Sequence, residues 1–179
     1  MPVQTRAPQV THSSLERFNA APTDEAARTL LACLNSRDWA HRLTAHRPYP
    51  DLPSLLAAAD EAAYDLTAQD LAEALAAETL PALPEDTYAA AHTALSAATA
   101  AYEARFGHVF VICVDGLSAD EALDHVLAAI RSRLTNDPDE ERLVAAEELR
   151  RIARGRLTDA LQGRGAVTSA APPRGATSH

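Results

Sequence analysis

Arg156 is the residue whose position most readily suggests chemistry. It follows Ala145, Leu149 and Ile152 at spacings of four, three and four, so it continues an apolar helical stripe. An arginine in this place is expected at the edge of the core, where its guanidinium can bind a carboxylate through two hydrogen bonds. The alternative is a structural arginine that covers apolar surface or pairs with a core acid, and on pattern alone this role is the commoner one.

A second candidate is the short apolar run near position 110. We interpret it either as a buried extended segment or as a helix, because periodicity does not decide for so short a run. If it is extended, its amide groups could serve a polar ligand; the alternative is a purely structural connector. The run consists of Phe110, Val111, Ile112, Cys113 and Val114, and Asp115-Gly116 closes it.

The elements that would position these residues are helices. Capping boxes are predicted at Thr67 with Asp70 and at Ser118 with Glu121, and Asp137 is a cap before Pro138. We therefore predict an all-α fold, a single compact domain over 15–162, with segments 1–14 and 163–179 disordered. About seven helices are expected, at 24–34, around Trp39 and Leu43, and at 52–66, 68–77, 86–105, 119–134 and 138–161. Arg150, Arg151 and Arg154 in the last of them are interpreted as solvated side chains that complement the helix dipole.

Composition excludes several classes of function. The net charge is −9 and all 16 basic residues are arginine, which argues against nucleic acid and anionic membranes as partners. The lack of lysine also excludes Schiff-base chemistry. None of the seven histidines forms a zinc-type spacing, so no structural metal is expected, and His92 and His125 are interpreted as surface or satisfied core histidines. Cys33 and Cys113 are interpreted as reduced core residues of a cytoplasmic protein rather than as a disulfide.

Four landmarks, in order, carry a resemblance to a known family. They are Phe18-Asn19-Ala20, then Arg47-Pro48-Tyr49, then the run from Tyr102 to Cys113, and finally Arg133-Leu134 with Asn136-Asp137-Pro138 and the arginine-rich helix through Leu157. Over about 17–161 the chain resembles the 2-oxo-4-hydroxy-4-carboxy-5-ureidoimidazoline (OHCU) decarboxylases, which form allantoin in urate breakdown. The resemblance implies an all-helical, usually dimeric protein that needs no cofactor. It also implies a substrate pocket formed by the backbone of residues 110–114 and by Arg156.

The sequence departs from this family at the catalytic histidine. The family has a His-Pro motif where this chain has Glu78-Thr79, and the path to Tyr102 is shorter here. A histidine would protonate the carbanion left by loss of carbon dioxide. Glu78 could replace it only if its pKa were raised, and we expect instead a solvated carboxylate at the end of a helix. Three hypotheses follow: an active enzyme on a small anionic ureido compound, a degenerate ligand-binding or protein-interaction module, and a diverged enzyme.

Overall fold

The computed structural model describes residues 13–80 and 89–162, and within them it contains eight α-helices and no β-strand. The all-α prediction is therefore confirmed. The helices are α1 (Ser14–Ala20), α2 (Thr23–Cys33), α3 (Arg37–Ala45), α4 (Leu52–Tyr64), α5 (Ala68–Ala76), α6 (Ala89–Phe106), α7 (Ala119–Arg133) and α8 (Pro138–Gln162). No helix in the described ranges is both long and apolar enough to cross a membrane.

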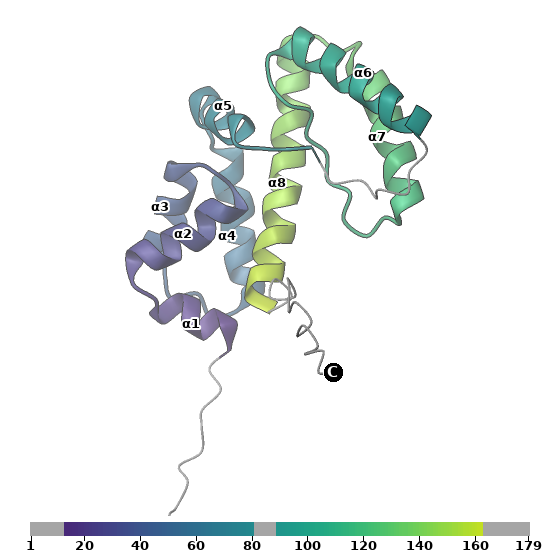
Figure 1. Cartoon of the computed structure of the whole chain (residues 1–179). Helices are drawn as coiled ribbons and strands as arrows, with labels where there is room; N and C mark the ends of the chain where they lie inside the picture. Colours follow the sequence, from purple (N-terminus) through teal and green to yellow (C-terminus); the bar gives the residue numbers. More distant parts are fainter. Residues whose placement is uncertain (1–12, 81–88, 163–179) are drawn as a thin grey trace, which may run out of the picture.

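The last helix, α8, is central to the fold, with the other helices on either side of it. It packs against α1, α2 and α4, while α6 and α7 pack against each other. Figure 1 shows α1–α5 on one side of α8, with α6 and α7 on the other. The chain can begin α8 sharply because the Asp137 carboxylate accepts hydrogen bonds from the amides of Asp139 and Glu140, both at 2.9 Å.

Two groups of buried side chains form the core. The larger one joins α1–α5 to one face of α8 and includes Trp39, Leu55, Leu149 and Leu157. The smaller one lies between α6 and α7 and consists of Tyr102, Phe110, Ile112, Val126 and Ile130.

The apolar run near position 110 is not helical; it connects α6 to α7. Successive side chains of an extended chain point in opposite directions. Accordingly, Phe110 and Ile112 enter the smaller core while Val111 enters the larger one. The extended alternative of the sequence interpretation is the one the structure adopts, and the run bridges the two cores.

Two of the sequence landmarks meet in one joint far from this segment. The Asn19 amide donates to the carbonyl oxygen of Tyr49 at 2.8 Å and accepts from its N–H at 2.9 Å. Arg47 Nη1 donates to the carbonyl oxygens of Phe18, at 2.7 Å, and Ala21, at 2.8 Å, at the end of α1. These landmarks therefore fasten α1 to the loop after α3.

The predicted helices are present, and one was missed. The capping boxes at Thr67–Asp70 and Ser118–Glu121 form as expected. The missed helix is α1, which begins with a third capping box between Ser13 and Glu16. It is only seven residues long, too short for periodicity to show. The segments predicted to be disordered lie almost wholly outside the described residues, as does the predicted start of α6 at 86–88.

Candidate functional site

Glu78 and Arg156 form a two-point ion pair. Arg156 Nη1 donates to Glu78 Oε1 at 2.7 Å, and Nη2 donates to Oε2 at 2.9 Å. Nη1 also donates to the Cys33 carbonyl oxygen at 3.2 Å. The Glu78 side chain is 5% exposed and that of Arg156 is 42% exposed. The expectation of a solvated carboxylate at the end of a helix is therefore wrong. Glu78 lies two residues after the end of α5, where its side chain contacts α8.

This pair borders a cavity of about 180 Å³ between α8 and the run 110–114. Five of the seven candidate residues named from sequence line it: Glu78, Val111, Ile112, Val114 and Arg156. The structure does not bring the other two to the cavity. Phe110 is fully buried in the smaller core, and Cys113 is not among the lining residues. The remaining lining residues are Thr79, Asp115, Ile152, Gly155 and Asp159.

Two side chains hold the backbone of the run in place. Arg133 Nη1 donates to the Val111 carbonyl oxygen at 2.7 Å, and the Cys113 N–H donates to Glu148 Oε2 at 2.8 Å. Between these anchors lies Ile112, which is 4% exposed. Its N–H and carbonyl form no hydrogen bond with any other described residue. Buried peptide groups rarely stay without a partner, so this donor and acceptor are suited to a ligand.

The first anchor belongs to a buried polar cluster. Arg133 donates to Glu141 Oε1 through Nε at 2.8 Å and through Nη2 at 2.6 Å, and the Tyr102 hydroxyl donates to the same oxygen. Asn136 Nδ2 donates to Glu141 Oε2 at 2.9 Å. The guanidinium of Arg133 also lies over the Phe110 ring, 4.4 Å from its centroid. Each polar group has a partner, which is what makes an ion pair tolerable at this depth.

The charges around the cavity are predominantly negative. Glu78, Asp115 and Asp159 line it together with one arginine. The hydrogen bonds with Glu78 raise the pKa of Arg156 above its usual range, so the guanidinium stays charged. Burial raises the pKa of the nearby Cys33 thiol to about 11, which keeps it protonated and unreactive at neutral pH. The cavity therefore offers carboxylates, one neutralised cation and free peptide groups.

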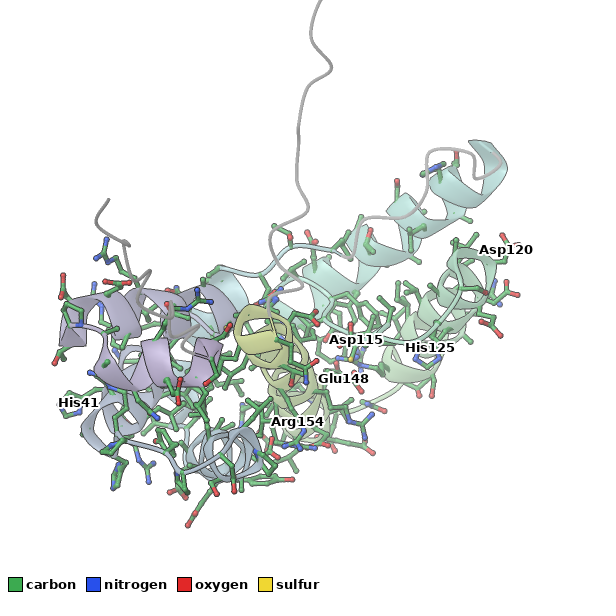
Figure 2. All side chains as sticks on the ribbon, turned by 90° about the horizontal axis from the view of Figure 1, so that it is seen from below. His41, Asp115, Asp120, His125, Glu148 and Arg154 are labelled. Atoms are coloured by element: carbon green, nitrogen blue, oxygen red, sulfur yellow. The ribbon has the colours of Figure 1, made fainter. Side chains whose placement is uncertain are left out.

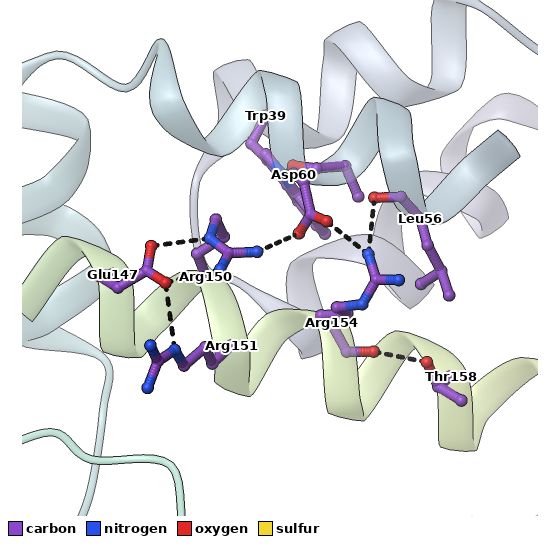
Figure 3. A network of polar contacts seen from close by, with 9 residues as sticks. Trp39, Leu56, Asp60, Glu147, Arg150, Arg151, Arg154 and Thr158 are labelled. Carbon is purple, nitrogen blue, oxygen red and sulfur yellow. Dashed lines mark hydrogen bonds and ion pairs between the residues drawn. The ribbon is translucent and has the colours of Figure 1, made fainter. Parts of the chain in front are cut away.

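A larger, more open hollow of about 670 Å³ adjoins this cavity along α8. Figure 3 shows its polar network, in which the Asp60 carboxylate binds both Arg150, at 2.8 Å, and Arg154. Arg150 also binds Glu147 at 2.6 Å, and its side chain is 17% exposed. The interpretation of Arg150 as a solvated residue is therefore wrong, because Asp60 on α4 faces it across the helix contact.

Sequence reasoning missed several residues of this site, and two of them left a signal. Arg133 follows Val126 and Ile130 at spacings of four and three, the same continuation of an apolar stripe that drew attention to Arg156. Gly155 stands inside an otherwise strong helix, where glycine costs about 1 kcal/mol and usually has a packing reason. Glu148 and Asp115 had no signal of this kind. Among the described residues, no cluster of three or more histidine, cysteine or acidic side chains could hold a metal ion.

Comparisons with known sequences identify a family. A family model described as OHCU decarboxylase matches residues 19–91 and 80–158. The curated 2-oxo-4-hydroxy-4-carboxy-5-ureidoimidazoline decarboxylase of Amia calva is 40% identical over 63 residues, which are 35% of this chain and 34% of that protein. The match thus spans about a third of the relative's length.

Two solved structures share the fold. The crystal structure of (S)-allantoin synthase has a TM-score of 0.65 and 23% identity, with 82% of this chain and 54% of that chain covered. The crystal structure of OHCU decarboxylase in the presence of (S)-allantoin has a TM-score of 0.66 and 22% identity, with 80% and 99% covered. These structures share the fold, and the family-model match over most of the described residues shows that this chain belongs to the OHCU decarboxylase family.

Proposed function

We propose that this chain binds a small ureido compound of the urate-breakdown type in the Glu78–Arg156 cavity without fast decarboxylation. The family supports the class of ligand, since one solved relative was crystallised in the presence of (S)-allantoin. The N–H and carbonyl of Ile112, which have no partner among the described residues, support the mode of binding, because a ureido group carries both donors and acceptors.

The two-point pairing of Glu78 with Arg156 carries the proposal. The family resemblance assigns this arginine to the substrate, but here both of its terminal nitrogens bind an internal carboxylate. A substrate carboxylate would have to displace Glu78 and would also meet Asp115 and Asp159. This arrangement favours an uncharged ligand over the anionic compound expected from sequence.

The need for a proton donor also argues against fast decarboxylation. Loss of carbon dioxide leaves a carbanion that needs a positioned acid, and the described lining of the cavity contains no histidine. A carboxylate that accepts two hydrogen bonds from a guanidinium is the ionised form of the acid. While it is paired with Arg156, Glu78 therefore has no proton to donate.

Decarboxylation is the second candidate, and one observation favours it. Glu78 stands where the family has its histidine and lines the cavity beside Val111 and Ile112. A substrate carboxylate that took over Arg156 would release Glu78, which could then gain a proton and deliver it to the carbanion after the carbon–carbon bond breaks. This route requires the Glu78–Arg156 pair to open on binding.

The test measures binding and turnover on the same full-length protein. Calorimetric titration with (S)-allantoin should give saturable binding, and incubation with the family's ureidoimidazoline substrate should not accelerate formation of optically active allantoin. Fast, stereospecific formation of allantoin would establish decarboxylation as the function. Absence of allantoin binding at millimolar concentration would refute the ligand-binding proposal.

A further inference from the structure

Asp115 occupies the boundary between the inner cavity and the outer hollow. It follows the run 110–114 directly and lines both spaces. Figure 2 places Asp115 near α8, with Asp120 at the far end of the neighbouring helix. A ligand that extended from the inner cavity into the outer hollow would therefore lie beside this carboxylate.

Gly155 on α8 makes room for the carboxylate in this position. A Cβ atom added at Gly155 would lie 2.2 Å from Asp115 Oδ2 and 3.4 Å from its Cγ. The glycine is helical, so the reason for it is space and not backbone conformation. A residue that costs helix stability thus permits the close approach of one acidic side chain to α8.

Asp115 is an exposed residue that lines both spaces. Within the described ranges, no arginine or histidine nitrogen lies within 4.0 Å of it to form an ion pair. Burial is the largest cause of the raised pKa of the Cys113 thiol, and Asp115 acts on it in both directions: its backbone hydrogen bond lowers this pKa and its charge raises it. The charge of Asp115 also adds to the effect of Glu78 in raising the pKa of Arg156.

We propose that Asp115, whose carboxylate lies against Gly155, is a specificity residue that favours the binding of uncharged ureides over carboxylates. This inference rests on the proposed function and names the ligand class of that site. A carboxylate accepts hydrogen bonds from the N–H groups of a ureide and repels another carboxylate. The N–H and carbonyl of Ile112, which lines the same cavity and has no partner for these groups among the described residues, are complementary to an –NH–CO– unit.

The test compares two ligands that share a five-membered ring and differ in charge, (S)-allantoin and hydantoin-5-acetate. The wild type should bind allantoin more tightly. Asp115→Asn should weaken allantoin binding about tenfold, because a hydrogen bond to a charged group becomes a neutral one. It should leave hydantoin-5-acetate unchanged or more tightly bound, so the selectivity falls at least tenfold.

Two further variants control this result. Gly155→Ala displaces the carboxylate without removing it and should lower selectivity in the same direction. Asp120→Asn removes an exposed charge from the first turn of α7 and should change neither affinity. Allantoin binding with unchanged selectivity in Asp115→Asn would overturn the inference alone. Binding of neither ligand by the wild type would overturn the proposed function and this inference together.

Discussion

At the scale of single residues, the site is dominated by the pairing of a nearly buried carboxylate with a half-exposed arginine. The two side chains differ in exposure, 5% for Glu78 and 42% for Arg156, and this difference determines how much each charge depends on its partner. The glutamate depends on the arginine because it has lost most of its contact with water, whereas the arginine retains much of its own. The pair is therefore a structural contact and a ligand-site contact at once.

Replacing Arg156 by methionine should lower the free energy of unfolding by about 1 kcal/mol. The change leaves Glu78 without its cation, and the effect is discounted because the guanidinium is partly solvated. Urea unfolding measures it. The double variant Glu78→Gln with Arg156→Met should recover most of the loss, since no buried charge then remains. A double variant that loses the sum of both single effects would contradict this coupling.

Replacing Glu78 by glutamine should convert the cavity into an anion site. The charge of Arg156 is then no longer neutralised, so binding of hydantoin-5-acetate should strengthen about tenfold relative to the wild type. Calorimetry measures the change, and thermal unfolding is the control for folding. Unaltered anion affinity in a folded variant would show that Glu78 does not compete for the arginine.

At the scale of elements, the buried cluster of Tyr102, Arg133 and Glu141 joins α6, α7 and α8 to the run 110–114. Glu141 is 0% exposed and the Arg133 side chain 8% exposed. Arg133 reaches past this pair to the Val111 carbonyl oxygen. The cluster therefore positions the backbone that lines the cavity, although none of its three side chains does so.

Arg133→Met should destabilise the protein by about 3 kcal/mol, because removing one partner leaves a buried charge uncompensated. Urea unfolding should show a lower midpoint with an unchanged slope. Glu141→Gln with Arg133→Met should be less destabilised than Arg133→Met alone. Equal stability of wild type and Arg133→Met would mean that water reaches Glu141 and that the cluster is not sealed.

The ion pair between Glu147 and Arg150, both on α8, should make the free energy of unfolding depend on pH in the acid range. Hydrogen bonds from Arg150 lower the pKa of Glu147 from 4.5 to about 2. A lowered folded-state pKa stabilises the fold above the unfolded pKa, so this contribution is complete above pH 4.5 and is lost as the pH falls toward 2. Because the Glu147 side chain is 33% exposed, the loss should be on the order of 1 kcal/mol.

Stability curves in urea between pH 6 and pH 2.5 test this dependence. Glu147→Gln removes the titrating group, so the loss of stability between pH 6 and pH 2.5 should be smaller by about 1 kcal/mol. Asp120→Asn, which removes an exposed carboxylate, is the control variant and should not change this loss. If Glu147→Gln leaves the acid slope unchanged, the Arg150 pairing does not contribute to stability in solution.

At the scale of the whole molecule, α8 contributes residues to the larger core, to the buried polar cluster and to the cavity. It contributes Leu149 and Leu157 to the larger core, Glu141 to the buried cluster and Arg156 to the cavity. The extended run 110–114 is its counterpart, since its alternating side chains join the two cores. The site therefore lies where the two halves of the core meet.

The homodimer implied by the family resemblance stays a prediction at this scale. Tyr64 and Leu143 are large apolar side chains that are 70% and 74% exposed, and both line one surface hollow that a second copy of the chain would cover in a dimer. Light scattering at micromolar concentration should give twice the chain mass of 19.1 kDa. A mass of 19.1 kDa across the accessible concentrations would contradict it.

Most of the helices, and the family, could be predicted from the order of residues along the chain. Caps such as Ser118 with Glu121 are local, since the two residues stand three apart and need no tertiary partner. The position of Arg156 at the edge of the core followed from an equally local periodicity. The short helix α1 was not predicted because seven residues make too few turns to show a helical hydrophobic periodicity.

The pairing of the site residues depends on how distant elements pack, and it could not be predicted from local sequence. Glu78 and Arg156 are 78 residues apart, and their pairing depends on how the end of α5 meets α8. Likewise, Asp115 has significance only because Gly155 lies opposite to it. Local propensity determines which face a residue occupies, but the partner it meets there depends on the packing of separate elements. The arginine could be found from sequence for that reason, and its neutralisation by Glu78 could not.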